Sequence, residues 1–352
     1  MRRLGLGLGS TPRRKQLAAY VAIIEAWKPD VIHIHGTERD YGLVYTRGFT
    51  NVPTMVSIQG LIQICQKKLF GELQKAEIIG RLSSIVPFWR KEILRTYRHF
   101  KVHANTEKEI LRKVDMVAGR TAWDKAWAIT CNPNGQYRHV DEIMRPDFYA
   151  SAPWDIAQCN PNQIFTTSGC QPLKGLHILI EAVSFLKKVI PTIKLKVASH
   201  GFGAKVRTAY GRYIKRLVQR YELMENVAFI GWLDANELAQ HIRQSNCFVT
   251  PSFIENGCNA LQEAMLVGIP CIASHAGGLT TTLEPPNSGL TFPAGDAAML
   301  AMCIRTVFKD QQRAIEMGQN AYQIARQRHD PAKVVQQNMD CYDQLISMQT
   351  AN

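Results

Sequence analysis

From residue 162 onward, short apolar runs alternate with amphipathic stretches, and this alternation constrains the fold more than any other feature of the sequence. It is typical of parallel βα units, whose strands are buried on both faces. After Lys174, apolar residues recur at spacings of three and four, which predicts a helix that covers a sheet. Further helices are expected at 237–243, 259–266, 296–328 and 331–347. The expected strands are 162–169, 192–199, 226–231, 247–252 and 269–274. The second half should therefore be a doubly wound α/β domain.

The first half of the chain has fewer predicted strands. We expect them at 30–35, 54–59 and 114–119, with a helix from about Arg14 to Trp27 before the first. A chain of 352 residues is typical of two domains, and 46% hydrophobic residues suffice for two cores. No window approaches the roughly 18 consecutive apolar residues of a membrane-spanning helix, and the start lacks a signal-peptide apolar region. The nine cysteines are scattered without CxxC spacing, which indicates neither a disulfide framework nor a zinc site. We therefore expect a cytoplasmic protein of two domains.

The densest group of informative residues lies between Pro251 and Gly278. It follows an apolar strand and leads into a predicted helix, so the turn 252–259 should lie at the carboxyl edge of a parallel sheet, where ligands bind. Amides at the N-terminus of that helix would suit a phosphate. Glu255 and Glu263 lie eight positions apart in this stretch. Two carboxylates beside an anion site need other partners, and sugar hydroxyls are suitable donors.

These residues resemble the E-x7-E signature of glycosyltransferase family 4, whose members have the GT-B fold of two Rossmann-like domains facing a cleft. Similar segments follow the family order from about residue 28 to residue 347: KPDVIHIHGTE, QPLKGLHILIEAV, NVAFIGWLDANEL and AGGLTTTLEPPNSGLTFPAGDAAMLA. Shorter stretches such as MRPDFY and ENGCNALQEAM are similar to a bacterial subgroup that assembles surface polysaccharides. The resemblance implies that a sugar is transferred from a nucleotide-sugar to an acceptor hydroxyl, with retention at the anomeric carbon.

The resemblance also implies roles for individual residues. Glu263 would hold the donor ribose hydroxyls, Glu255 would contact the donor sugar, and Lys174 would neutralise the diphosphate. Further donor-binding positions would be Gly175, Gly231, Gly257, Cys258, Asn259, Ala260 and Leu261. Acceptor-side candidates are His35, Gln59 and Arg120. No metal or other cofactor is expected, since the chain contains no DxD triplet and GT-B enzymes generally work without a bound metal.

Three parts are expected along the chain. Residues 1–155 would form the acceptor-side domain, residues 156–328 the donor-binding domain, and residues 329–352 a helix that reaches back to the first domain. Asp141, Glu142 and Arg145 are candidates for the hinge between the domains. Base and sugar selectivity should depend on the loops that follow Ala198 and Gly231.

Four features differ from the family pattern. Only about 28 residues precede the first matched strand, so the first strand and its loop are expected to be missing and the first domain to be abbreviated; GLGLGS at 4–9 follows no strand and is interpreted as a tail. Gly169 stands where a basic residue is usual, and Gln59 stands where a histidine often ends the strand. Asn256 and Cys258 replace common glycines. A plain spacer is favoured over a reactive thiol for Cys258.

Residues 61–113 form a basic segment, with twelve Lys or Arg against five Glu. Solvated helix faces explain such a segment, and so does contact with an anionic membrane near lipid-linked acceptors. Nucleic-acid binding is disfavoured because no recognised module is present.

The expected function is a retaining sugar transfer in bacterial polysaccharide or glycoconjugate assembly, with a sugar or lipid-linked glycan as acceptor. One alternative is a catalytically incomplete fragment that binds nucleotide-sugar or a partner without turnover. A less favoured alternative is a nucleotide-sugar epimerase of the same fold.

Overall fold

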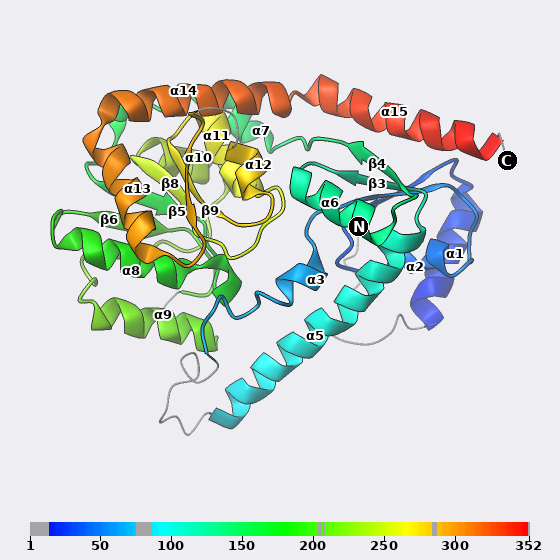
Figure 1. Ribbon diagram of the computed structural model, residues 1–352, viewed down its shortest axis with the longest axis horizontal. Helices are drawn as coiled ribbons and strands as arrows, with labels where there is room; N and C mark the ends of the chain where they lie inside the picture. Colours follow the sequence, from blue (N-terminus) through cyan, green and yellow to red (C-terminus); the bar gives the residue numbers. More distant parts are fainter. Residues whose placement is uncertain (1–13, 75–85, 203–205, 207, 284–286, 351–352) are drawn as a thin grey trace. The chain divides into compact units, whose positions relative to one another are not determined.

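A computed structural model describes residues 14–74, 86–202, 206, 208–283 and 287–350 of the chain (Figure 1). The chain divides into two compact units. The first comprises the described parts of 1–67, 90–141 and 332–352, and the second comprises those of 68–89 and 142–331. The GLGLGS segment and part of the basic segment 61–113 lie outside the described residues.

The second unit is built on a sheet of six strands, and every neighbouring pair of strands is parallel. The strands are β5 (Gln163–Thr166), β6 (Lys194–Val197), β7 (Val227–Phe229), β8 (Cys247–Thr250), β9 (Cys271–His275) and β10 (Leu290–Pro293). Their order in space is β10-β9-β8-β5-β6-β7. The expected doubly wound α/β fold is confirmed.

Two groups of helices pack around this sheet (Figure 1). One group is α8 (Leu176–Lys187), α9 (Ala209–Arg220) and α13 (Ala297–Lys309), and the other is α7 (Pro146–Ala150), α10 (Ala235–Arg243), α11 (Asn259–Val267) and α14 (Gln311–Arg328). The short α12 (Leu279–Leu283) follows β9. Helix α10 begins at Ala235 because the side chains of Asp234 and Glu237 each accept a hydrogen bond from the other's backbone N–H.

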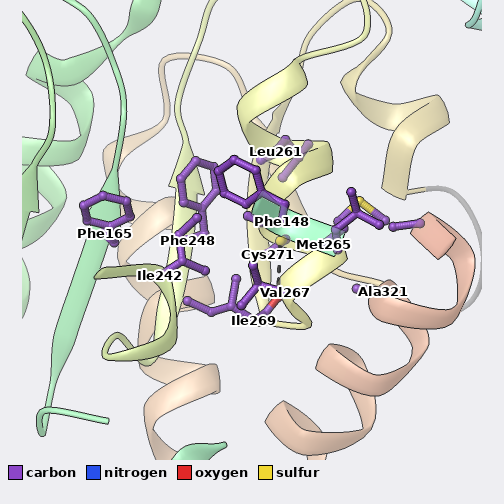
Figure 2. Close-up of a cluster of buried hydrophobic side chains, with 14 of the residues drawn as sticks. Phe148, Phe165, Ile242, Phe248, Leu261, Met265, Val267, Ile269, Cys271 and Ala321 are labelled. Atoms are coloured by element: carbon purple, nitrogen blue, oxygen red, sulfur yellow. Dashed lines mark hydrogen bonds between the residues drawn. The ribbon is translucent and has the colours of Figure 1, made fainter. Parts of the chain in front are cut away.

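A cluster of fully buried side chains joins α7, α10 and α11 to the sheet (Figure 2). Phe148 of α7, Phe248 of β8 and Leu261 and Met265 of α11 all belong to it. Burial of each of these side chains stabilises the folded state by roughly 1.5–3 kcal/mol relative to an exposed side chain. Helix α11, which carries the second glutamate of the signature, is therefore held firmly against the sheet.

The first unit is a parallel sheet of four strands in the order β1-β2-β3-β4. The strands are β1 (Ile32–His35), β2 (Thr54–Ser57), β3 (Met116–Gly119) and β4 (Gln136–His139). Its helices are α1 (Arg14–Trp27), α2 (Leu43–Thr46), α3 (Ile62–Cys65), α6 (Ala122–Cys131) and, except for their first residues, α5 (Val86–Lys113) and α15 (Pro331–Thr350). Cys341 and Leu345 of α15 are buried with Met55 and Met116 of the sheet. Over the described ranges, no helix has both the length and the apolar character needed to cross a membrane.

Sequence patterns did not predict two strands, β4 and β10. Both lie at the edge of their sheet. The QYRH residues of β4 are half-buried or exposed, and in β10 only Phe292 is buried. An edge strand pairs on one side only and needs no continuous apolar run, so the pattern typical of buried strands is absent from both.

Candidate active site

Lys174 and Glu255 meet at the carboxyl ends of β5 and β8. The strand order reverses between these two strands, and ligands of doubly wound sheets bind at such a point. Lys174 Nζ lies 2.5 Å from Glu255 Oε1, and the Ser252 hydroxyl donates to the same oxygen at 2.8 Å. The side chains are only 34% and 14% exposed, so this ion pair is less screened than a surface pair. The structure thus brings two of the three expected catalytic residues together.

Glycines make this close approach possible. Gly175 has φ of +68°, and a Cβ there would overlap the carbonyl oxygen of Pro251 at the end of β8. Gly277 has φ of +59°, and a Cβ there would overlap the carbonyl oxygen of Glu255. The backbone N–H of Gly278 donates to that same oxygen at 3.0 Å. The turn that carries Glu255 is therefore packed between two backbone segments that admit no side chain.

The expected donor-binding stretch leads into α11. Cys258 is the residue before the helix, and its side chain makes no capping hydrogen bond to the first amides of α11. Amides at such a terminus carry partial positive charge and suit a phosphate. Gly257 is buried, Asn259 is exposed and the Leu261 side chain lies in the core, so Leu261 offers a ligand only its backbone. Burial raises the pKa of the Cys258 thiol to about 11, which supports the spacer interpretation over a reactive thiol.

Glu263 is paired with Arg145, a contact that sequence reasoning missed. Arg145 Nε and Nη2 donate to Glu263 Oε1 and Oε2, each at 2.7 Å, and this hydrogen bond raises the pKa of the guanidinium. Only 7% of the glutamate side chain is exposed, against 45% of the arginine side chain. The sequence marks Arg145 as a hinge candidate and MRPDFY as similar to the bacterial subgroup, but no spacing rule links residues 118 positions apart.

Arg145 and Glu263 both line a cavity of about 220 Å³ in the second unit. Its other lining residues are Phe148, Thr167, Ala198, Trp232, Leu233, Leu238, Ile242 and Ala260. Ala198 follows β6, and Trp232 follows Gly231, whose φ is +80°. Apolar and aromatic walls with a few converging polar groups are typical of a small-ligand site. The two loops expected to govern base selectivity thus line the same cavity as the ribose-binding candidate.

The acceptor-side candidates lie at the carboxyl ends of β1, β2 and β3 in the first unit. Arg120 Nη2 donates to Gln59 Oε1 at 3.3 Å, so these two are brought together. His35 is exposed, and its ring lies 4.0 Å from that of His33. The half-buried Glu38, which sequence reasoning did not single out, lies close to Gly60, and burial raises its pKa. Among the described residues, no three His, Cys, Asp or Glu side chains gather in a way that could hold a metal ion.

Glu107 gives the first unit a testable pH dependence. Burial raises its pKa to about 7, although the Thr37 hydroxyl and the backbone N–H groups of Ile62 and Gln63 donate to its carboxylate at 2.7–2.9 Å. The folded chain then binds a proton that the unfolded chain has lost between about pH 4.5 and 7, so the free energy of unfolding falls as pH rises through this window. We expect Glu107 to lower the free energy of unfolding by up to about 1.4 kcal/mol for each pH unit in this window.

Urea unfolding of wild type and Glu107→Gln at pH 5.5 and pH 8 measures this contribution. The variant should lose less stability than wild type between the two pH values. Equal losses would show that Glu107 is already ionised at pH 5.5.

The second unit is similar to known glycosyltransferases. Residues 157–324 match the model of the family described as glycosyl transferases group 1. A D-inositol 3-phosphate glycosyltransferase of Corynebacterium efficiens is 29% identical over 156 residues, which cover 44% of this chain and 37% of that protein. The Escherichia coli K12 glycosyltransferase named for colanic acid biosynthesis, WcaL, is 28% identical over 151 residues, or 41% and 36% of the two chains. The chain thus spans little more than a third of the length of these relatives.

Solved structures show the fold of the whole chain. Sucrose-phosphate synthase from Thermosynechococcus elongatus has a TM-score of 0.74 at 22% identity, over 97% of this chain and 83% of that one. Anabaena HepE, solved with UDP and glucose, has a TM-score of 0.68 at 19% identity, over 94% and 81%. The chain thus has the GT-B fold, and its residues 157–324 match the model of the glycosyl transferases group 1 family.

Proposed function

We propose that this chain transfers a sugar from a nucleotide-sugar to an acceptor hydroxyl, with retention at the anomeric carbon, during assembly of a polysaccharide or glycoconjugate. The observation that carries the proposal is the arrangement in the second unit. There, the Lys174–Glu255 pair lies where the strand order reverses. Glu263, on the helix that follows, lines a largely apolar cavity. The names of the Escherichia coli relative and of the HepE complex with UDP and glucose agree with this chemistry.

The second unit supplies the groups that donor chemistry needs. The cavity between Ala198 and Trp232 would take the base, and Glu263 would accept hydrogen bonds from the ribose hydroxyls. The diphosphate would lie between Lys174 and the amides that open α11, with the donor sugar at Glu255. As the bond from the anomeric carbon to the diphosphate breaks, negative charge grows on the departing oxygen. A fixed ammonium group and fixed amides stabilise that charge without reorganising.

We propose that this reaction needs no metal ion, because Lys174 and the amides of α11 would provide the stabilising charge. The rate of transfer should therefore be unchanged when EDTA is added in excess over any Mg²⁺ or Mn²⁺. A large loss of rate in EDTA, restored by either ion, would contradict this part of the proposal.

The acceptor is proposed to be a sugar or a lipid-linked glycan presented at the cytoplasmic surface of a membrane. Helix α5 supports this, since its sequence carries eight Lys or Arg against three Glu. Clustered basic residues are attracted to anionic headgroups by about 1 kcal/mol each near the surface. Cosedimentation at low salt should occur with vesicles that contain anionic lipid and not with zwitterionic vesicles. Equal recovery with both would remove the membrane from the proposal.

A thermal-shift screen against UDP-, GDP-, ADP- and TDP-sugars tests the donor site. A ligand at about 100 times its Kd stabilises the folded state by roughly 2.7 kcal/mol, so one donor should raise the melting temperature. Glu263→Ala and Lys174→Ala should abolish this shift, whereas the exposed Lys188→Ala should keep it. A cooperative melt that no donor shifts would contradict the proposed donor site.

A further inference from the structure

Phe253 lies in the turn that carries Glu255, and it is fixed against the segment that carries Lys174. Phe253 is buried, and its backbone N–H donates at 2.8 Å to the carbonyl of Leu173, the neighbour of Lys174. A Cβ at Gly71 would lie 3.0 Å from the Phe253 ring, so the segment that contains Gly71 packs closely against this turn. Because Glu255 follows Phe253 by two residues, a shift of Phe253 would move Glu255 relative to Lys174.

The ring of His177, on α8, joins the parts of this arrangement. The imidazole stacks on the Phe253 ring, with ring centres 5.6 Å apart and an angle of 13° between the planes. Its Nδ1 lies 2.9 Å from the Tyr210 hydroxyl of α9, and its Nε2 lies 3.1 Å from the carbonyl oxygen of Gly71. One buried side chain thus contacts the Phe253 turn, the Gly71 segment and a second helix.

The hydrogen bonds determine which ring nitrogen of His177 carries the proton. The backbone N–H of His177 donates to the Tyr210 oxygen at 3.2 Å, so the hydroxyl proton of Tyr210 is available for Nδ1. Nδ1 is then an acceptor, and the ring proton lies on Nε2, which donates to the Gly71 carbonyl. Burial lowers the pKa of the imidazole to about 4, so the ring is neutral near pH 7 and keeps this tautomer.

We propose that His177 is a positioning residue for sugar transfer, which fixes Phe253 to the Gly71 segment and thereby holds Glu255 and Lys174 in their working geometry. The inference rests on the proposed function, since Lys174 would stabilise the departing diphosphate and Glu255 would contact the donor sugar. A catalytic group that is displaced by about 1 Å through a distant change can cost about 100-fold in rate.

Variants of His177 test the inference through the rate of nucleoside diphosphate release at saturating donor. His177→Phe keeps a ring that can stack on Phe253 but lacks both nitrogens, so kcat should fall by about 10- to 100-fold. His177→Gln supplies an N–H that can reach the Gly71 carbonyl, and it should recover most of this loss. Ile193→Ala removes a fully buried side chain immediately before β6. It should lower the melting temperature and retain the wild-type kcat, which controls for lost stability.

Tyr210→Phe tests the role of the fixed tautomer. Without the hydroxyl, the ring proton can move to Nδ1, and Nε2 then has no hydrogen to donate to the Gly71 carbonyl. We therefore expect kcat to fall in this variant as well. In the His177→Phe background, Tyr210→Phe should have little further effect on kcat, because the hydroxyl acts through the imidazole.

Hydrogen exchange measures the positioning without any transfer reaction. The backbone amides of peptides that cover 68–74 and 252–258 should exchange faster in His177→Phe than in wild type, because both segments lose their tie to α8. Unchanged exchange in both peptides would overturn the inference even if kcat falls.

Three kinetic outcomes would also overturn the inference. One is a wild-type kcat in His177→Phe, and another is a rise in KM alone, which would mean that the ring affects only donor binding. The third is an equal loss of kcat in His177→Phe and His177→Gln, which would show that donation to Gly71 does not matter. A wild type that releases no nucleoside diphosphate from any donor would refute the proposed function itself, whereas the three outcomes above leave that function standing.

Discussion

Replacement of Lys174 by alanine is expected to lower kcat for sugar transfer by about 100- to 1000-fold, the usual loss when one fixed group that stabilises a developing negative charge is removed. The lysine is held at the carboxyl end of β5 by its contact with Glu255 at 2.5 Å. Its charge is therefore in place before the diphosphate begins to leave. The measurement is the rate of nucleoside diphosphate release at saturating donor, with the donor found in the thermal-shift screen.

Glu255, the ion-pair partner of Lys174, affects the result of the Lys174→Ala measurement and also provides a control for it. Lys174→Ala leaves Glu255 with the Ser252 hydroxyl and no cation, and the remaining carboxylate would repel the diphosphate. Adding Glu255→Gln removes that repulsion, so the double variant should regain donor affinity but not kcat. Lys188→Ala, which removes an exposed lysine after α8, should retain the wild-type kcat. A single variant that loses affinity alone would show that Lys174 binds the donor and does not stabilise the leaving group.

Much of the second unit could be predicted from sequence because local patterns carry the necessary information. Buried parallel strands produce apolar runs, and α8 shows the helical spacing that its packing against the sheet requires. The glycine at 175 and the turn before α11 are also local features. By contrast, β4 and β10 are edge strands with few buried residues, and no periodic signal marks them.

The parts of the site that were missed depend on contacts between distant residues. Arg145 and Glu263 are far apart in sequence, and their contact exists only because the buried cluster brings α7 against α11. Glu38 likewise approaches Gly60 only because β1 and β2 pair in parallel, so that their carboxyl ends meet. Motifs locate residues that share one strand and its following loop. Motifs do not predict which charged side chain from another element will pair with those residues.

Gly175→Ala is expected to destabilise the second unit by more than about 3 kcal/mol, a cost that combines left-handed backbone strain with a steric overlap. The strain accounts for about 1–2 kcal/mol at φ of +68°. The overlap adds to it because a Cβ at Gly175 would meet the carbonyl oxygen of Pro251, which belongs to the backbone and has no rotamer to change. Relief requires the start of α8 to move away from β8, which would also carry Lys174 away from Glu255.

Gly231→Ala is the matched control for this prediction. Its φ of +80° imposes similar strain, but a Cβ there would have no heavy atom within 4 Å. Urea unfolding of both variants then separates strain from overlap: Gly231→Ala should cost about 1–2 kcal/mol, and the excess at Gly175 measures the overlap. Equal losses at the two positions would mean that α8 yields to the added methyl group at almost no cost. Lys174 would then move as easily as the start of α8. A cation that moves has to be repositioned in the transition state, which would weaken its stabilisation of the leaving group.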